Sequence, residues 1–369
     1  MTVRPMTFVL APDSFKGTAT AHQACEFLSA GICEVLPDAT IIDAPMADGG
    51  EGTSSLFAGS SVTLPTTSAD GMLIDATYTF IPAHDKEPAT AVIDVAAASG
   101  LPGVGDKHSP LTSDTFGTGV LIADAVERGA QRIVLGLGGS ATVDGGTGIL
   151  VALGATPMDH RGYMLRQGGG ELRNLDFIDT AQLNVKAAAV EWVLLADVTN
   201  PATGPKGAAA VFGPQKGASA EDVDILDAGI SRLCTVCDIN PTTAGFGAAG
   251  AIPVGLSWLS RLIHGTDSQI QLQPGAPFLA AQHRLAESIA AADVVVTGEG
   301  RVDETSFGGK VVGCVTELAA TADTTAVVVC GSYEATQHPT EVYELAPDME
   351  VAEQMRAAGR ELARTYMQG

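Results

Sequence analysis

The stretch DVVVTGEG, residues 293–300, decides the fold because it repeats a pattern first met near the N-terminus. A short β-branched run leads directly into a glycine-rich polar loop, which is typical of a buried strand in a parallel sheet. TFVLAP at 7–12 and ATIIDAPM at 39–46 have the same form, and a helix with a capping box from Thr20 to Gln23 is predicted between them. We therefore expect both ends of the chain to build one doubly wound α/β domain.

The middle of the chain follows another pattern. Three strand candidates at 61–70, 71–82 and 89–99 are joined by short turns, with Asp70-Gly71 as a hairpin signal, so an antiparallel meander is expected. Alternating helices and strands follow, including the strands RIVLGL at 132–137 and EWVLLADV at 191–198. This order is that of an RNase H-like mixed sheet, a fold-level analogy only.

We predict a discontinuous flavodoxin-like domain, residues 1–60 and 285–369, interrupted by an inserted RNase H-like domain, residues 61–284. The region 199–284 is rich in glycine, proline and alanine and shows weak periodicity. It is expected to form loops and short helices.

Composition restricts the class of partner. The 369 residues carry a net charge of −23, which disfavours nucleic acid and anionic membranes because their phosphates would be repelled. The N-terminal apolar patch is too short for a signal peptide, so a cytoplasmic location is expected. A small anionic ligand needs only a local group of donors, and the basic residues inside glycine-rich loops could supply it.

Cysteine and histidine do not suggest zinc chemistry. Cys234 and Cys237 form a lone C-x-x-C in an apolar stretch, without the second pair of a zinc site, and are predicted to be buried thiols. The seven histidines show no metal-ligand spacing, and G-x-S-x-G is absent from the sequence.

Five polar loops follow predicted strands, where ligands bind in open α/β sheets. Turn chemistry explains their glycines but not the charged residues that recur with them: Lys16, Asp48, Glu51, Asp144, Asp197, Glu299, Arg301 and Asp303. Carboxylates, a few cations and glycine-rich backbone are the groups used in phosphoryl transfer.

The loop GLGGSA, residues 136–141, allows three interpretations. It matches the dinucleotide pattern G-x-G-x-x-A, with Asp159 about 20 residues further on. Its backbone N–H groups would equally suit a phosphate, and a simple turn is the third interpretation. A second cluster, DGGTG at 144–148, favours the phosphate cradle over the dinucleotide site because it delays the helix start.

ADVTNP, residues 196–201, also has two interpretations. An aspartate at a strand end beside an asparagine can hold Mg²⁺ or accept a proton from a substrate hydroxyl. The alternative is a turn stabilised by Asn200 before Pro201.

Taken together, the motifs resemble the type 1 glycerate kinases. The resemblance runs in order from about residue 8 to 331 and rests on APDSFKG (11–17), PMADGGEGT (45–53), GGSATVDGG (138–146), GGGELRNLDFID (168–179), DVTNP (197–201), GPKGAAAVFGPQKGA (204–218) and GEGRVDETSFGGK (298–310). It implies ATP-dependent phosphorylation of D-glycerate with Mg²⁺, with 2-phosphoglycerate favoured over 3-phosphoglycerate. It also implies an active site in a cleft between a flavodoxin-like and an RNase H-like domain.

The resemblance also suggests residue roles. Asp197 would be the catalytic base, and Lys16 and Arg301 would neutralise phosphoryl or carboxylate charge. The substrate and metal groups would be Asp13, Ser14, Asp48, Glu51, Asn200, Glu299 and Asp303, with Asp48 and Glu51 as metal ligands. Phosphate would lie on Gly138, Gly139, Ser140, Asp144, Gly145 and Gly146.

Two rival functions stay open at this point. One is an NAD(P)-dependent hydroxy-acid dehydrogenase that uses GLGGSA, and the other is a non-catalytic binder of small hydroxy acids. The partners expected are D-glycerate and a second copy of the chain in a homodimer.

Overall fold

The structure is a computed structural model that describes residues 5–105, 108–336, 341–346 and 349–367. The chain divides into two compact units, which we call the parallel-sheet unit (Met1–Asp48 with Pro274–Gly369) and the mixed-sheet unit (Gly49–Gln273). The structure divides the chain at 48/49 and 273/274. The boundaries expected from the sequence, at 60/61 and 284/285, each lie further along the chain.

The parallel-sheet unit contains a five-stranded sheet in the order β13-β12-β11-β1-β2, with every neighbouring pair parallel. The two similar β-branched runs at 7–12 and 293–300 therefore share this sheet, with Phe8 opposite Val294. The strand bounds are β1 (Thr7–Leu10), β2 (Thr40–Asp43), β11 (Val294–Val302), β12 (Thr325–Tyr333) and β13 (Glu341–Glu344).

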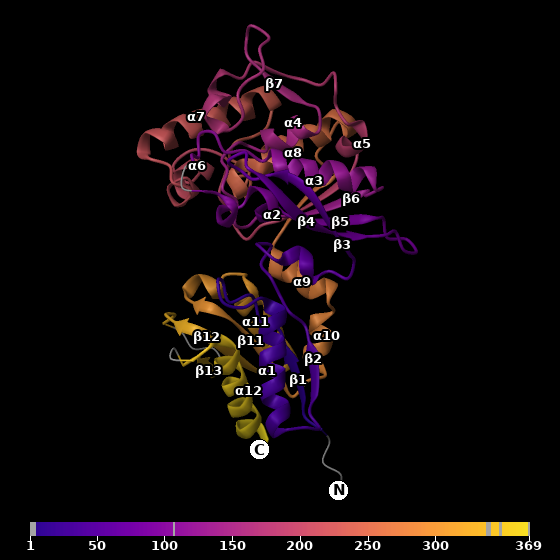
Figure 1. The fold of residues 1–369 in the computed structure, drawn as a ribbon, viewed down its shortest axis with the longest axis vertical. Coiled ribbons are helices and arrows are strands. Elements are labelled where there is room, and N and C mark those ends of the chain that lie inside the picture. Colours follow the sequence, from indigo (N-terminus) through magenta and orange to yellow (C-terminus); the bar gives the residue numbers. More distant parts are fainter. Residues whose placement is uncertain (1–4, 106–107, 337–340, 347–348, 368–369) are drawn as a thin grey trace. The chain divides into compact units, whose positions relative to one another are not determined.

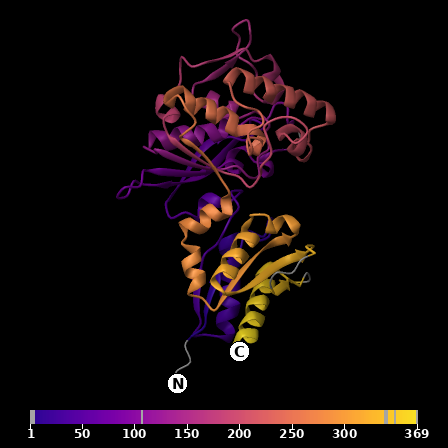
Figure 2. The ribbon, with the colours of Figure 1, turned by 180° about the vertical axis from the view of Figure 1, so that it is seen from behind.

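Helices cover both faces of this sheet, as the two opposite views in Figures 1 and 2 show. On one face, α1 and α12 pack together and bury Leu28, Ile32 and Leu362 with the strand residues Phe8 and Leu10. The expected capping box at Thr20 and Gln23 is present at the start of α1. The helix bounds in this unit are α1 (Ala21–Val35), α9 (Gly275–Gln282), α10 (Leu285–Ala290), α11 (Val311–Ala322) and α12 (Val351–Met367).

The mixed-sheet unit contains a six-stranded sheet in the order β10-β9-β6-β5-β4-β3. The predicted meander is confirmed, because β3, β4 and β5 pair antiparallel, whereas β5, β6, β9 and β10 pair parallel. The strand bounds are β3 (Ser60–Thr67), β4 (Leu73–Ile81), β5 (Thr90–Asp94), β6 (Arg132–Gly136), β9 (Glu191–Leu195) and β10 (Ile270–Gln273), with β7 (Thr156–Met158) and β8 (Phe177–Asp179) in a separate pair.

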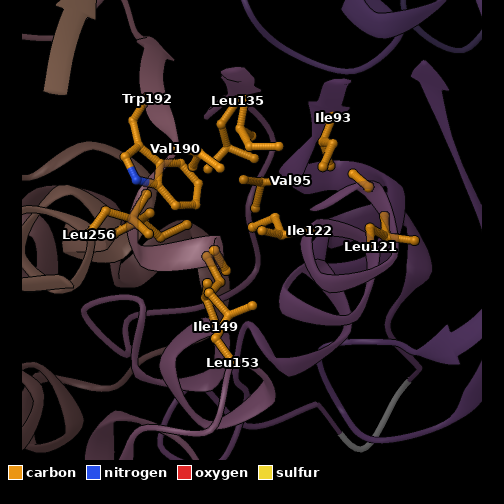
Figure 3. Packing of buried hydrophobic residues seen from close by; sticks show 14 of the residues in the cluster. Ile93, Val95, Leu121, Ile122, Leu135, Ile149, Leu153, Val190, Trp192 and Leu256 are labelled. Carbon is orange, nitrogen blue, oxygen red and sulfur yellow. The ribbon is translucent and has the colours of Figure 1, made fainter. Parts of the chain in front are cut away.

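A large apolar core lies between this sheet and its helices. Figure 3 shows Trp192 and Leu135 from the strands beside Ile149 and Leu256 from two helices. The helix bounds are α2 (Val95–Ser99), α3 (Phe116–Glu127), α4 (Thr147–Ala152), α5 (Val185–Ala188), α6 (Ala208–Phe212), α7 (Ala220–Cys237) and α8 (Ala248–His264).

The expectation of loops and short helices at 199–284 was wrong for α7 and α8, which have 18 and 17 residues. A capping box from Ser219 to Asp222 starts α7, and one apolar stripe of that helix is buried. The first turn of α8 is left-handed, and a Cβ at Gly250 would lie 2.1 Å from the Thr142 carbonyl oxygen. Because of this irregular start, the sequence pattern did not predict α8.

The predicted buried thiols are confirmed, since Cys234 and Cys237 are free and lie on the buried side of α7. Within the described residues, no helix is long and apolar enough to cross a lipid bilayer.

Candidate functional site

The loop after β1 continues the sheet before it turns. The Asp13 amide donates to the Gly298 carbonyl of β11 over 2.8 Å, so Asp13 stays fixed beside that strand. Gly17, with a φ of +78°, makes the tight turn that lets Phe15 pair with Ala19. The loop therefore holds Asp13 buried and presents Lys16 at its exposed tip.

The polar loop of β11 has one exposed cation and one capping acid. Arg301 is 64% exposed and lies 3.6 Å from Asp303 and 3.4 Å from Glu334. Asp303 caps the short helix η5 (Glu304–Phe307) by accepting from the Thr305 amide at 2.8 Å and the Thr305 hydroxyl at 2.6 Å. These hydrogen bonds lower the Asp303 pKa, so we assign this carboxylate a structural role.

Burial and neighbouring negative charges raise the pKa of two carboxyl groups in the parallel-sheet unit. Burial, and then the charge of Asp48, raises the pKa of Asp13 to about 7. Burial also raises the pKa of Glu299, to which Asp48 contributes. Among the described residues, Glu299 Oε1 is buried without a hydrogen-bond partner. Lys16 and Lys310 offset only part of this negative charge, so the group suits a cation or a proton-bearing ligand.

A pocket of about 1120 Å³ opens beside these groups. Its walls come from the β1 loop, the end of β11 and the segment around the start of α12. The side chains that matter below are Lys16, Glu299, Arg301, Leu345, Met349 and Val351. The pocket thus lies at the carboxyl ends of parallel strands, where α/β sheets bind ligands.

The raised pKa of Asp13 predicts a pH-dependent stability effect. Between about pH 4 and pH 7 the folded protein keeps a proton that the unfolded chain loses, so this group makes stability fall as pH rises. Asp13→Asn removes that penalty and should stabilise the protein by ~2–4 kcal/mol more at about pH 8 than at about pH 4. Urea unfolding followed by circular dichroism at both pH values checks this.

The matched control for that measurement is Asp38→Asn, which changes an exposed aspartate of the same unit. Because its side chain is exposed, this replacement should change the free energy of unfolding little. Equal effects of Asp13→Asn at the two pH values would contradict the assignment.

In the mixed-sheet unit, the loop Gly49–Ser54 is held by a buried acid that sequence reasoning missed. Asp94, at the end of β5, is 4% exposed and accepts from the Gly52 amide at 3.0 Å and from the amide and hydroxyl of Ser54, each at 3.0 Å. Glu51 lies on the exposed side of this loop. An acid at the end of a strand was the available signal, but Asp94 sits in the run VIDVAAAS with no adjacent glycines.

The loop after β6 uses several of its backbone donors internally. The Gly138 amide donates to the Gly49 carbonyl at 3.0 Å, and the Ala141 amide donates to the Ser99 carbonyl at 2.9 Å. A Cβ at Gly138 would lie 2.6 Å from the Gly50 Cα, so only glycine allows this approach. Gly139 is the exposed residue of the loop, and Ser140 is 5% exposed.

The second half of the predicted phosphate loop is a buried helix cap. Asp144 is fully buried and accepts from Thr115, through its amide at 2.9 Å and its hydroxyl at 2.8 Å, and from the amides of Gly146 and Gly148. The Gly145 amide donates to the Gly250 carbonyl. The hypothesis that Asp144, Gly145 and Gly146 offer groups to phosphate therefore needs correction: the amides of both glycines and the carboxylate are already used inside the fold.

Lys216 is a buried cation whose role the sequence did not reveal. Its ammonium donates to the Ser140 hydroxyl at 2.9 Å and to the Thr142 carbonyl at 2.7 Å, and the residue is 3% exposed. Burial lowers its pKa to about 7, and the charge of Asp144 opposes this shift. Lys216 therefore fixes the segment 140–142, and its place between Gln215 and Gly217 in FGPQKGA gave only a weak signal.

Asp197 and Asn200 follow β9. Asp197 lies two residues beyond the strand and is half-buried. The Asn200 side-chain amide donates to the Lys206 carbonyl at 2.8 Å, and the Asn200 backbone carbonyl accepts from the Gly247 amide at 2.9 Å. These hydrogen bonds give Asn200 a structural role in the loop after β9.

The predicted site residues fall into two groups. The parallel-sheet unit brings together Asp13, Ser14, Lys16, Asp48, Glu299, Arg301 and Asp303; the mixed-sheet unit carries Glu51, Asp197, Asn200 and the loop 138–146. The two expected metal ligands, Asp48 and Glu51, belong to different units. Among the described side chains, no group of three or more His, Cys, Asp or Glu residues could hold a metal by itself.

The dinucleotide interpretation of GLGGSA finds no support in this geometry. The helix α4 begins only at Thr147, and Asp159 follows β7, which pairs with β8 outside the main sheet. The Asp159 carboxylate accepts from the amides of Arg161 and Tyr163 in its own turn. An acid that binds a ribose would instead follow a strand of the parallel sheet.

Comparison with known proteins gives one consistent result. The model of the glycerate kinase family matches residues 8–368. A glycerate kinase of Bacillus subtilis (strain 168) is 40% identical over 334 residues, 89% of this chain and 85% of that protein. The glycerate 2-kinase of Escherichia coli (strain K12) is 37% identical over 318 residues, 83% of this chain and 80% of that protein.

Solved structures agree. A crystal structure from Salmonella typhimurium LT2, assigned as glycerate kinase 2, superposes with a TM-score of 0.83 at 34% identity and covers 99% of both chains. The predicted combination of a parallel sheet and a separate mixed sheet is confirmed.

Proposed function

From the premise that this chain belongs to the glycerate kinase family, we propose that it transfers the γ-phosphoryl group of ATP to D-glycerate and forms 2-phosphoglycerate rather than 3-phosphoglycerate. The observation that carries the proposal is the family match over residues 8–368, together with relatives named as glycerate kinases. The choice of 2-phosphoglycerate is supported by the E. coli relative, which is named a glycerate 2-kinase. None of these comparisons supports a dehydrogenase.

The parallel-sheet unit would supply charge neutralisation. Phosphoryl transfer depends mainly on positioning and on offsetting negative charge, because the transition state is loose. Lys16 and Arg301 are the exposed cations that line its pocket and would approach phosphate or carboxylate oxygens.

The carboxylates of that unit fit a divalent cation in part. Burial and the charge of Asp48 raise the pKa values of Asp13 and Glu299, and Glu299 has a buried oxygen without a described partner. Mg²⁺ commonly takes only one or two protein carboxylates and completes its shell with phosphates and water. Asp48 and Glu299 would hold it, and Mg²⁺ would offset the phosphate charge of the nucleotide.

The mixed-sheet unit would supply the proton acceptor. Asp197 would orient the glycerate hydroxyl and accept its proton as the phosphoryl group is transferred. Ser140, fixed by Lys216, and the exposed Gly139 are the parts of the loop 138–146 that would contact an anion. Glu51 lies on the loop Gly49–Ser54, which Asp94 holds, and would add a carboxylate to the substrate and metal groups.

Activity is expected to require Mg²⁺. Treatment with EDTA should abolish turnover, and Mg²⁺ should restore it. Asp48→Asn should raise the Mg²⁺ concentration needed for half-maximal rate by about 10-fold or more. The exposed Asp38→Asn in the same unit serves as control, and full turnover of EDTA-treated enzyme without added metal would refute the requirement.

The proposed reaction is tested by coupling ADP production to NADH oxidation with D-glycerate as acceptor. The product is then identified by ³¹P NMR, which separates 2-phosphoglycerate from 3-phosphoglycerate. ATP consumption that does not depend on glycerate, or glycerate binding without ATP consumption, would count against the proposal. The homodimer and the cytoplasmic location stay predictions, to be checked by light scattering and cell fractionation.

A further inference from the structure

The pocket of the parallel-sheet unit has two chemically different walls. The β1 loop and β11 contribute the cations Lys16 and Arg301 beside the acid Glu299. The segment before and at the start of α12 contributes the apolar Leu345, Met349 and Val351, together with the polar Glu350 and Gln354. Met349 is 41% exposed although its side chain is apolar. Apolar and cationic side chains that line one pocket suit a ligand with both an apolar and an anionic part.

The volume of the pocket also favours a ligand larger than glycerate. At about 1120 Å³ it is slightly larger than the usual range for small-molecule sites, ~300–1,000 Å³. D-Glycerate would leave most of it filled with water and could not use the apolar wall. ATP has an aromatic base for the apolar side and phosphates for the cations.

The rival place for the nucleotide phosphates is the loop after β6, and several of its donors are occupied. The amides of Gly138, Ala141 and Gly145 donate to carbonyls within the fold, and those of Gly146 and Gly148 donate to Asp144. These amides are not available to a polyphosphate, and within the described residues the loop itself offers no apolar wall for a base, which favours the parallel-sheet pocket as the nucleotide site.

We infer that the nucleotide binds in this pocket, with the adenine against Met349 and Val351 and the phosphates toward Lys16 and Arg301. The inference rests on the proposed function, because it takes ATP as the phosphoryl donor. The inference names the unit and the side chains that recognise the phosphoryl donor. Glycerate would then bind at a different site.

The test measures binding to the full chain by calorimetry, with ADP and Mg²⁺ and, separately, with adenosine. Met349→Glu places a carboxylate on the apolar wall and should weaken the binding of both ligands. The dissociation constant of ADP should rise by about 10-fold or more, the change that a loss of ~1.4 kcal/mol produces. Lys16→Met should weaken ADP but leave adenosine unchanged, because adenosine has no phosphates.

Two matched variants control for nonspecific effects. Met367→Glu makes the same change at a methionine that is 53% exposed at the end of α12 and does not line the pocket. Lys186→Met removes a surface lysine of the mixed-sheet unit, 73% exposed beside Glu127. Both should bind ADP like the wild type.

The possible results separate this inference from the proposed function. Wild-type affinity of Met349→Glu for ADP, or a raised KM for glycerate in that variant with ADP binding intact, would overturn the nucleotide pocket without touching the glycerate kinase activity. Conversely, ADP binding that Met349→Glu weakens, in a protein that does not phosphorylate glycerate, would support the pocket and refute the proposed acceptor. A wild-type chain that binds no ADP would overturn the inference.

Discussion

Replacing Asp197 by asparagine is expected to lower the turnover number by ~10² or more, the usual scale for the loss of a general base. The affinity for ATP should change little. In a loose transition state the base orients the hydroxyl and takes its proton late, so substrate binding does not depend on it. Initial rates at saturating substrates and calorimetric titration with ADP measure the two quantities separately.

The structure supports this choice through the backbone that carries Asp197. β9 is paired on both sides, with β6 and β10, and the Ala196 amide donates to the Gln273 carbonyl at 2.9 Å. A side chain next to such a strand has little freedom, which favours orientation of a single hydroxyl.

Asp179→Asn, an exposed aspartate of the same unit, is the matched control. Near-normal turnover of Asp197→Asn with collapsed ATP binding would make Asp197 a ligand of the metal–nucleotide complex. The base would then be sought at Asp48 or Glu51. Asp303 is the poorer alternative, because its carboxylate already caps η5.

Replacing Asp144 by alanine is expected to destabilise the mixed-sheet unit by about 3–5 kcal/mol. The substitution leaves buried donors of Thr115, Gly146 and Gly148 without their acceptor. Both tryptophans, Trp192 and Trp258, lie in this unit, so urea unfolding followed by tryptophan fluorescence reports on it.

The control is Asp159→Ala, which removes a carboxylate that also accepts from two amides, but in an exposed turn. Water can replace that acceptor, so the loss of stability should be much smaller. Similar losses for the two variants would show that Asp144 is not the structural cap described above.

Much of the fold could be predicted from local patterns. The β-branched runs at 7–12 and 293–300, the hairpin at Asp70-Gly71 and the capping box at Thr20 each involve residues close together in the chain. Helices and strands impose short periods on such stretches, so the pattern survives without tertiary information. The helix α8 was not predicted because its first turn is left-handed, and that conformation accompanies a tertiary contact of Gly250 with Thr142.

The sequence by itself determined the order of strands and helices, the two kinds of sheet, and motifs specific enough to identify the family. Only the tertiary structure decided what individual polar side chains do. Asp94 meets the Ser54 amide across 40 positions, Asp144 meets Thr115 across 29, and Lys216 meets Ser140 across 76. A carboxylate or ammonium is available to a ligand only if no buried partner already takes its hydrogen bonds, and those partners come from remote parts of the chain.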